Sequence, residues 1–329
     1  MLQNRRVSEL ADAVLPMIRT RADLHRWSAA NEHGRQMHEA VDLLEGSTAE
    51  PAEIYAVTRK AVASAITVIA RADDSSGVIG DACRRLLDLH PKAAAAAKAP
   101  AGKLVDWMMA FQFTGEVDYF TLDPVAYAPA LGEAGLASYR ARLNEVAAGL
   151  PLLPPDTERW QAPYSHTRFV LDWNEQRLAV LDRDIEAIIR THARDRRVAA
   201  WLEDTAKAFE EIGEIDLAID WAKQAAHFDS GHQAKTAAQT WCRLLAEHRP
   251  AELVEARLTV FRRWPTSGHA AEVREAAGRD WDQHREEVMD GLADRPWESV
   301  AFALHSLKDA ELAWNLAHVS GHEIPQLAG

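Results

Sequence analysis

The side chains whose type and spacing best suit recognition of a partner are charged residues between positions 194 and 214. They are Arg194, Arg196, Arg197, Glu203, Lys207, Glu210 and Glu214. The arginines form a basic spot at the end of a predicted helix, where the helix dipole favours cations and a phosphate contact is the alternative role. The stretch from residue 203 to residue 220 holds seven acids and one base, Lys207. We therefore take these residues as candidate binding residues.

No spacing in the sequence indicates catalysis, and we assign no catalytic residue. The motifs GxxxxGK[ST], GxGxxG, GxSxG and HExxH are absent. Asp73, Asp74 and Asp81 surround Gly77 as in a cation loop, but an EF-hand register would place Ala72 at the first ligand position. Acidic groups at a helix start instead satisfy free amides and the dipole.

Histidine spacing does not predict a metal site. His318 and His322 are four residues apart, which would place both on one face of a helix, but no third ligand follows beyond Glu323. We therefore predict neither a metal nor a cofactor.

Composition narrows the class of protein. The 329 residues carry a net charge of -13, which makes nucleic acid and anionic lipid unlikely partners. No N-terminal apolar run indicates secretion, and the longest uncharged helical run, 61–70, is far short of the roughly 20 residues that a membrane span needs. The two cysteines, Cys83 and Cys242, exclude a disulfide framework. We expect a cytoplasmic protein.

The charged candidates lie on a predicted helix pair, 198–229. Apolar residues recur at three- and four-residue steps, which indicates one buried face per helix. They are Val198, Trp201, Leu202, Phe209 and Ile212, then Ile215, Ala218, Trp221, Ala222 and Ala225. Gly213 can take the left-handed conformation that ends a helix.

Three further pairs follow. They span 233–247 with 251–263, 268–277 with 281–293, and 297–307 with 309–319. Nine of the eleven tryptophans lie at or after Trp160, about one per helix from Trp201 onward. Such large side chains are expected to anchor the seams between helices.

The preceding chain predicts an N-terminal helical unit, 1–148. Its helices are expected at 5–19, 21–45, 50–73, 77–90, 93–97, 104–113 and 133–148, with a segment at 119–132 broken by Pro124 and Pro129. A proline-rich corner, 149–165, is expected to separate this unit from the helical-repeat array, 166–329. Proline lacks a backbone donor and disfavours helical conformation in the residue before it, so a run of prolines ends a helix. The array begins with a long helix from Arg168 to Arg194.

Three runs carry a family resemblance: ADDSSGVIGDACRRLLDLHPKA at 72–93, APALGEAGLASYRARL at 128–143 and AFEEIGEIDLAIDWAKQA at 208–225. They resemble the uncharacterised bacterial helical region associated with SWIM-type zinc-finger proteins, which implies a helical scaffold. The finger itself is missing, so its nucleic-acid role does not carry over. The pair at 198–229 resembles a tetratricopeptide-type repeat, with Asp229 where a proline is expected.

Together these patterns predict an all-α, helical-hairpin (tetratricopeptide-like) solenoid with an N-terminal helical unit. The predicted function is a non-enzymatic protein–protein interaction scaffold that binds a peptide or helix. The alternatives are a nucleic-acid-associated module acting through the arginines and a hydrolase with dispersed active-site residues. No capping helix follows the last pair, so we also expect that the C-terminal helix pair either meets a second chain, as in a homo-oligomer, or continues in a partner.

Overall fold

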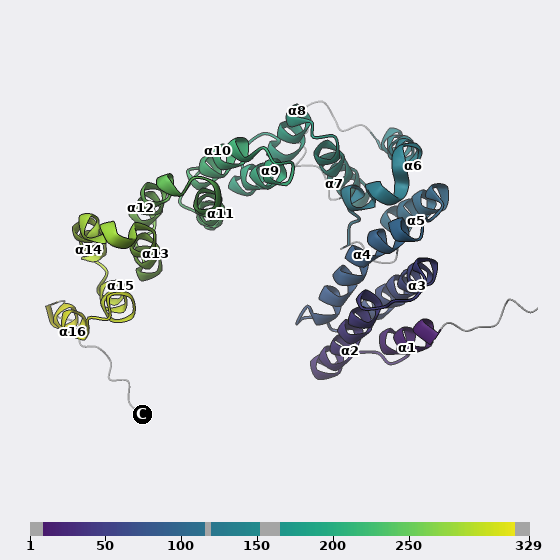
Figure 1. Ribbon diagram of the computed structural model, residues 1–329, viewed down its shortest axis with the longest axis horizontal. Coiled ribbons are helices and arrows are strands. Elements are labelled where there is room, and N and C mark those ends of the chain that lie inside the picture. Colours follow the sequence, from purple (N-terminus) through teal and green to yellow (C-terminus); the bar gives the residue numbers. More distant parts are fainter. Residues whose placement is uncertain (1–8, 116–119, 152–164, 320–329) are drawn as a thin grey trace, which may run out of the picture. The chain divides into compact units, whose positions relative to one another are not determined.

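The computed structural model describes residues 9–115, 120–151 and 165–319 (Figure 1). In these ranges the regular structure is helical, with no strand and one isolated parallel bridge between Leu24 and Ala72. The predicted all-α, helical-hairpin fold is confirmed, and the solenoid stays a prediction. No helix in the same ranges has the length and apolarity to cross a bilayer. The chain divides into two compact units, Met1–Asp182 and Arg183–Gly329.

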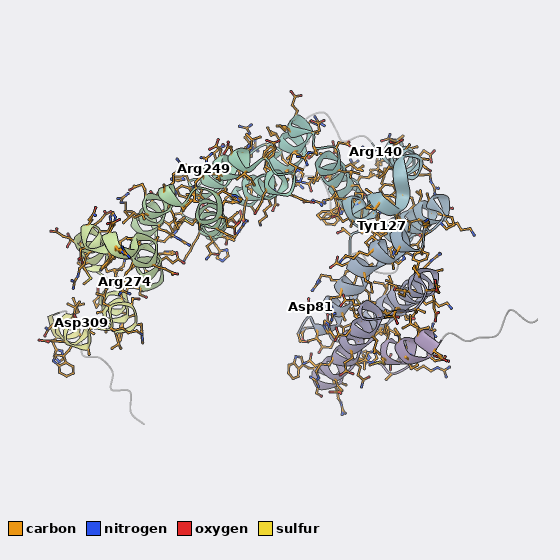
Figure 2. All side chains as sticks on the ribbon, in the orientation of Figure 1. Asp81, Tyr127, Arg140, Arg249, Arg274 and Asp309 are labelled. Carbon is orange, nitrogen blue, oxygen red and sulfur yellow. The ribbon has the colours of Figure 1, made fainter. Side chains whose placement is uncertain are left out.

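The helices of unit 1 run from purple to teal in Figure 1. They are α1 (Glu9–Ile18), α2 (Trp27–Glu45), α3 (Pro51–Ile69), α4 (Val78–Ala96), α5 (Ala101–Thr114), α6 (Pro124–Ala148) and α7 (His166–Leu181). α1 packs against α2 and α3, α4 packs against α2, α3 and α6, and α6 packs against α5 and α7. Their apolar faces share one core, which includes Met37, Leu86, Met108 and Tyr127, the last labelled in Figure 2.

α4 continues through Pro91, where the sequence predicted the end of a helix. Proline lacks a backbone donor and so removes one hydrogen bond from a helix interior. Pro91 is buried, as are Leu87 and Ala94 on either side of it. Burial of this apolar face offsets the missing hydrogen bond, so the predicted short helix at 93–97 is part of α4.

The predicted break at 119–132 lies at a glycine. Pro124 occupies the first position of α6, where no donor is needed, and Asp123 caps the helix by accepting from the Val125 amide at 2.9 Å. The kink is at Gly132, whose φ of 59° and ψ of -177° suit only glycine. The helix after the kink is regular, as predicted.

The predicted long helix 168–194 is interrupted between the two units. Arg183 has a φ of 55°, and the Asp184 carboxylate caps α8 (Ile185–Ile188) by accepting from the Ala187 amide at 3.0 Å. α7 packs against α5 and α6 and therefore belongs to unit 1, whereas the sequence pattern predicts that it begins the array. Most of the predicted corner, 152–164, lies outside the described residues.

Unit 2 continues from α8 with a π-helix, Ile189–Ala193. The α-helices that follow are α9 (Ala199–Glu211), α10 (Ile215–Ala226), α11 (His232–His248), α12 (Leu253–Arg263), α13 (Ser267–Ala277), α14 (Arg285–Leu292), α15 (Pro296–Ala301) and α16 (Ala310–Val319). 3₁₀-helices at Pro250–Glu252 and Gly278–Gln283 and a π-helix at Phe302–Leu307 complete the unit. α9, α10 and α11 pack against one another, and α11, α12 and α13 pack in sequence.

The turn between α9 and α10 confirms the predicted helix end at Gly213, which has a φ of 80°. The Glu214 amide donates to the Phe209 carbonyl and the Gly213 amide to the Glu210 carbonyl, both at 2.9 Å. This pairing is the Schellman motif, which satisfies carbonyls that a helix end leaves free.

The tryptophans range from buried to exposed. Trp221 and Trp241 are buried between helices, as predicted for seam residues. Trp297 and Trp314, in α15 and α16, are 61% and 67% exposed, so the seam prediction is wrong for them. Trp160 lies outside the described residues.

Candidate functional site

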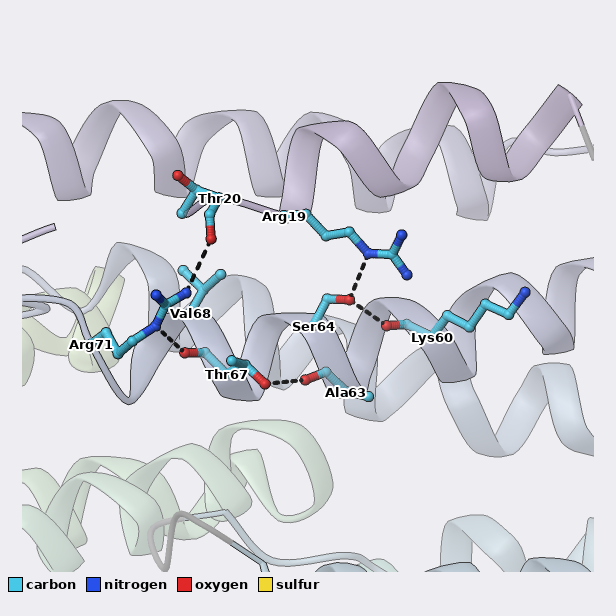
Figure 3. A pocket seen from close by; sticks show the side chains of 8 residues that line it. All are labelled: Arg19, Thr20, Lys60, Ala63, Ser64, Thr67, Val68 and Arg71. Carbon is cyan, nitrogen blue, oxygen red and sulfur yellow. Dashed lines mark hydrogen bonds between the residues drawn. The ribbon is translucent and has the colours of Figure 1, made fainter. Parts of the chain in front are cut away.

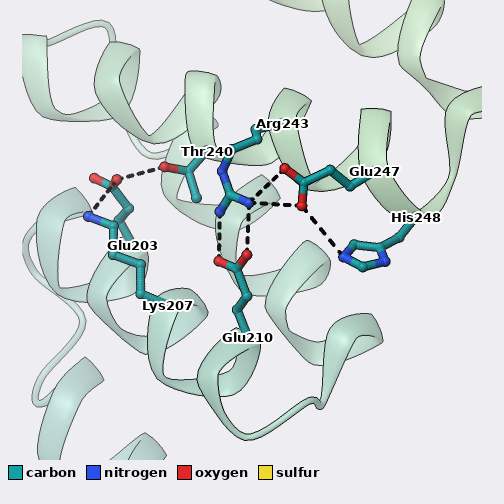
Figure 4. A network of polar contacts seen from close by, with 7 residues as sticks. All are labelled: Glu203, Lys207, Glu210, Thr240, Arg243, Glu247 and His248. Carbon is teal, nitrogen blue, oxygen red and sulfur yellow. Dashed lines mark hydrogen bonds and ion pairs between the residues drawn. The ribbon is translucent and has the colours of Figure 1, made fainter.

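Two of the acidic candidates, Glu203 and Glu210, lie on α9 and bind α11 (Figure 4). The sequence pattern predicts that Glu203 lies on an exposed helix face, yet this residue is only 6% exposed. Its carboxylate accepts a hydrogen bond from the Thr240 hydroxyl at 2.8 Å and pairs with Lys207 at 2.9 Å. Thr240 lies on α11, whose packing against α9 covers Glu203. Glu203 is therefore an internal contact rather than a surface residue.

Glu210 makes the second link between the same helices. Arg243 of α11 donates to both of its carboxylate oxygens, at 2.6 and 2.8 Å, and also pairs with Glu247 at 3.2 Å (Figure 4). The hydrogen bonds from Arg243 lower the pKa of Glu210 below its ordinary value. Glu214, half-buried at the start of α10, lies outside this network.

The arginine candidates precede α9, and two of them stack on tryptophan rings. The Arg194 guanidinium lies 4.9 Å from the Trp201 ring centroid, and Arg196 lies 5.0 Å from that of Trp221. Both arginines have positive φ values, 49° and 59°, which cost strain that the cation–π contacts help to offset. Arg197 pairs with Asp195 at 3.3 Å.

Two further cations lie on tryptophan rings around the end of α10. Lys223 is 5.9 Å from the Trp241 ring centroid and Arg263 is 5.3 Å from that of Trp264. Arg263 also donates to the Ala226 carbonyl at 3.2 Å, which attaches the end of α12 to the end of α10. We call Arg194, Arg196, Lys223 and Arg263 the cationic row.

The cationic row continues across neighbouring helices. Arg196 reaches Trp221 on α10, Lys223 of the same helix reaches Trp241 on α11, and Arg263 reaches the last residue of α10. The exposed Phe228 follows α10 directly. The row therefore joins the residues before α9 to α10, α11 and the end of α12 through contacts between cations and tryptophan rings.

The cations of the row make no ion pair in the described residues, whereas several other cations of unit 2 do. Ion pairs to carboxylates engage Lys207, Arg243, Arg249, Arg257 and Arg262. Within the described residues, none of the four cations of the row makes an ion pair. Three of them, Arg194, Arg196 and Lys223, are exposed. Their charge is thus available to an anionic partner.

The two cysteine thiols are buried. Burial raises the pKa of Cys83 to about 12 and that of Cys242 to about 11, so neither thiol ionises readily at neutral pH. No group of three or more His, Cys, Asp or Glu side chains among the described residues could hold a metal ion. His318 hydrogen-bonds through Nδ1 to the Trp314 carbonyl at 2.7 Å, and His322 lies outside the described part of the chain.

Half of the cationic row is predictable from the sequence. Arg194 and Arg196 were candidates because of their clustering, whereas Lys223 and Arg263 were not. The tryptophans at 201, 221, 241 and 264 are visible in the sequence, but their spacing does not show which cations lie on them. Which cation meets which ring depends on helix packing.

Comparison with known proteins gives no match to a protein-family model, to a curated protein or to a solved structure. The resemblance to the SWIM-associated helical region and the tetratricopeptide-like repeat therefore both stay predictions.

Proposed function

We propose that the protein is a non-enzymatic interaction scaffold whose unit 2 binds an acidic segment of a partner protein along the cationic row. The observation that carries this proposal is the placement of four cations on tryptophan rings without ion pairs in the described residues. The tetratricopeptide-like array and a cytoplasmic location belong to the same proposal.

An acidic protein segment suits the row for two reasons. Charge complementarity speeds encounter and selects the partner. The stacked cations have already lost part of their side-chain freedom, so binding orders them at a smaller entropic cost. A long nucleic acid is less suited, because a chain of net charge -13 repels a polyanion outside the row.

The test uses the full-length chain and a fluorescein-labelled oligoglutamate peptide, with oligoglutamine as the uncharged counterpart. Fluorescence anisotropy should show binding of oligoglutamate that weakens as salt is raised. The double variant Arg194→Gln/Lys223→Gln should weaken binding by about 1–2 kcal/mol, roughly 5- to 30-fold. Arg279→Gln/Arg285→Gln removes the same charge from exposed positions outside the row and should leave affinity within about twofold.

A labelled single-stranded oligonucleotide distinguishes the alternative. If the oligonucleotide binds through Arg194 and Lys223 and oligoglutamate does not, the function is nucleic-acid association. If the control double variant weakens oligoglutamate binding as much as Arg194→Gln/Lys223→Gln does, the binding reflects overall charge and the proposal fails.

We also propose that α15 and α16 mediate contact between copies of the chain. The exposed Trp297 and Trp314, with Leu304 44% exposed in the intervening π-helix, support this assignment. Large aromatic side chains are frequent in the centres of interfaces.

A further inference from the structure

A groove between the end of α1 and the outer face of α3 gathers cations and hydroxyl groups in unit 1 (Figure 3). Its volume is about 340 Å³, near the lower end of small-molecule sites. The lining residues are Arg19, Thr20, Lys60, Ala63, Ser64, Thr67, Val68 and Arg71. None of these described residues is acidic, which is unusual for a chain of net charge -13.

Helical spacing explains how these residues meet. Positions 60, 64, 67 and 71 follow one another at three- or four-residue steps along α3 and its C-terminal extension, so they share one face. The opposite face buries Val62 and Ile69 in the core. α1 packs against α3, and Arg19 directly follows α1.

Hydrogen bonds hold the arginines in place. Arg19 donates through Nε to the Ser64 hydroxyl at 3.1 Å, and Ser64 donates to the Lys60 carbonyl at 2.8 Å. Arg71 donates to the Thr20 and Thr67 carbonyls at 3.0 and 3.2 Å. The guanidinium groups are therefore ordered before any ligand arrives.

The cations nevertheless keep binding capacity. In the described residues, Arg19 uses only Nε and its two terminal nitrogens have no partner, and Lys60 makes no ion pair. Figure 3 shows the Arg19 and Lys60 side chains extending in the same direction, to the right in this view. Helix dipoles favour Arg19 and Arg71 after the ends of α1 and α3, but they do not explain Lys60, which lies within α3.

We propose that this groove binds a phosphate monoester between Arg19 and Lys60. The guanidinium fork suits two phosphate oxygens, and the lysine supplies a point charge to a third. Arg71 adds positive potential, although its Nη1 lies 3.9 Å from the exposed Asp23 carboxylate. This site belongs to unit 1 and does not depend on the function proposed for unit 2.

The test is isothermal titration of the full-length chain with inorganic phosphate at constant ionic strength, with chloride as the reference anion. The wild-type chain should bind phosphate, and Arg19→Gln and Lys60→Gln should each lower the affinity for phosphate roughly tenfold. Lys103→Gln removes an exposed charge elsewhere in unit 1 and should leave phosphate binding unchanged. Thermal melts check that each variant is folded.

A second arm separates a free ligand from a lipid headgroup. Vesicles containing phosphatidic acid, compared with pure phosphatidylcholine vesicles, test the same monoester in a membrane. Binding to either source that depends on Arg19 and Lys60 supports the site and identifies its ligand. No binding to either, or binding that Lys103→Gln reduces as much as Lys60→Gln does, overturns it. Loss of oligoglutamate binding to unit 2 leaves this result unaffected.

Discussion

The Tyr139 hydroxyl donates a 2.6 Å hydrogen bond to Asn174 Oδ1 and so joins α6 to α7. The contact is part of a closed ring, because the Gln112 amide donates to the Tyr139 hydroxyl at 2.7 Å and the Asn174 amide donates to Gln112 Oε1 at 3.0 Å. All three side chains are buried, and burial raises the pKa of Tyr139 to about 12. The ring satisfies each polar group and specifies the place of α7 in unit 1.

Replacing Tyr139 with Phe should destabilise unit 1 by about 1–3 kcal/mol, because the Gln112 donor and the Asn174 acceptor lose their buried partner. Hydrogen exchange should accelerate in α7, which the ring attaches to α5 and α6. The matched control is Tyr55→Phe, since Tyr55 is half-buried and its hydroxyl makes no hydrogen bond within the described residues. Urea unfolding and mass-spectrometric exchange measure both effects, and equal destabilisation by the two variants would contradict the role of the ring.

The sequence predicted the turn at Gly213 because its cause is local. A left-handed residue after an amphipathic helix is specified by the glycine itself. The break before α8 was missed because Leu181, Ile185 and Ile188 keep helical spacing across it. The helical spacing of apolar residues therefore continues across a point where the helical backbone is interrupted. Contacts with α5 and α6 decide that α7 belongs to unit 1.

The candidate site was harder to predict, because its contacts join distant residues. Arg196 meets Trp221 since α10 folds back along α9, and Glu203 is buried since α11 covers it. Clustering of charge found Arg194 and Arg196, but it could not separate cations on aromatic rings from cations paired with carboxylates. That distinction requires the packing of three helices.

His90 should make unit 1 less stable as the pH falls. Burial, together with the positive charge of Arg59, lowers the pKa of His90 from 6.5 to about 4. As the pH falls, the unfolded chain therefore binds a proton at this histidine before the folded chain does. The stability that neutral His90 contributes to unit 1 is complete above pH 6.5 and is lost as the pH falls to about 4. The loss should reach roughly 3 kcal/mol. Urea unfolding across this range should show a weaker pH dependence for His90→Gln, whereas the exposed control His25→Gln should retain it. An unchanged profile in His90→Gln would refute this assignment.

Glu203 and Glu214 should differ in their effect on unit 2, although both were surface candidates. Glu203→Ala removes a buried acceptor from Thr240 and Lys207 and should cost about 1–3 kcal/mol. Glu214→Ala breaks no side-chain hydrogen bond or ion pair among the described residues and should change the free energy of unfolding by less than about 0.5 kcal/mol. Chemical denaturation measures both values, and Glu203→Ala with wild-type stability would show that the carboxylate is not an internal link.

Trp297 and Trp314 should support self-association of the full-length chain. The two indoles expose most of their surface on α15 and α16, and burying each against a second copy removes apolar area from water. Sedimentation velocity should detect a concentration-dependent dimer that the double variant Trp297→Ser/Trp314→Ser abolishes. Trp27→Ser removes a comparably exposed tryptophan from unit 1 and should leave the dimer intact. A wild-type chain that sediments as a monomer at every concentration would refute the contact, and a dimer that persists in the double variant would place it on another surface.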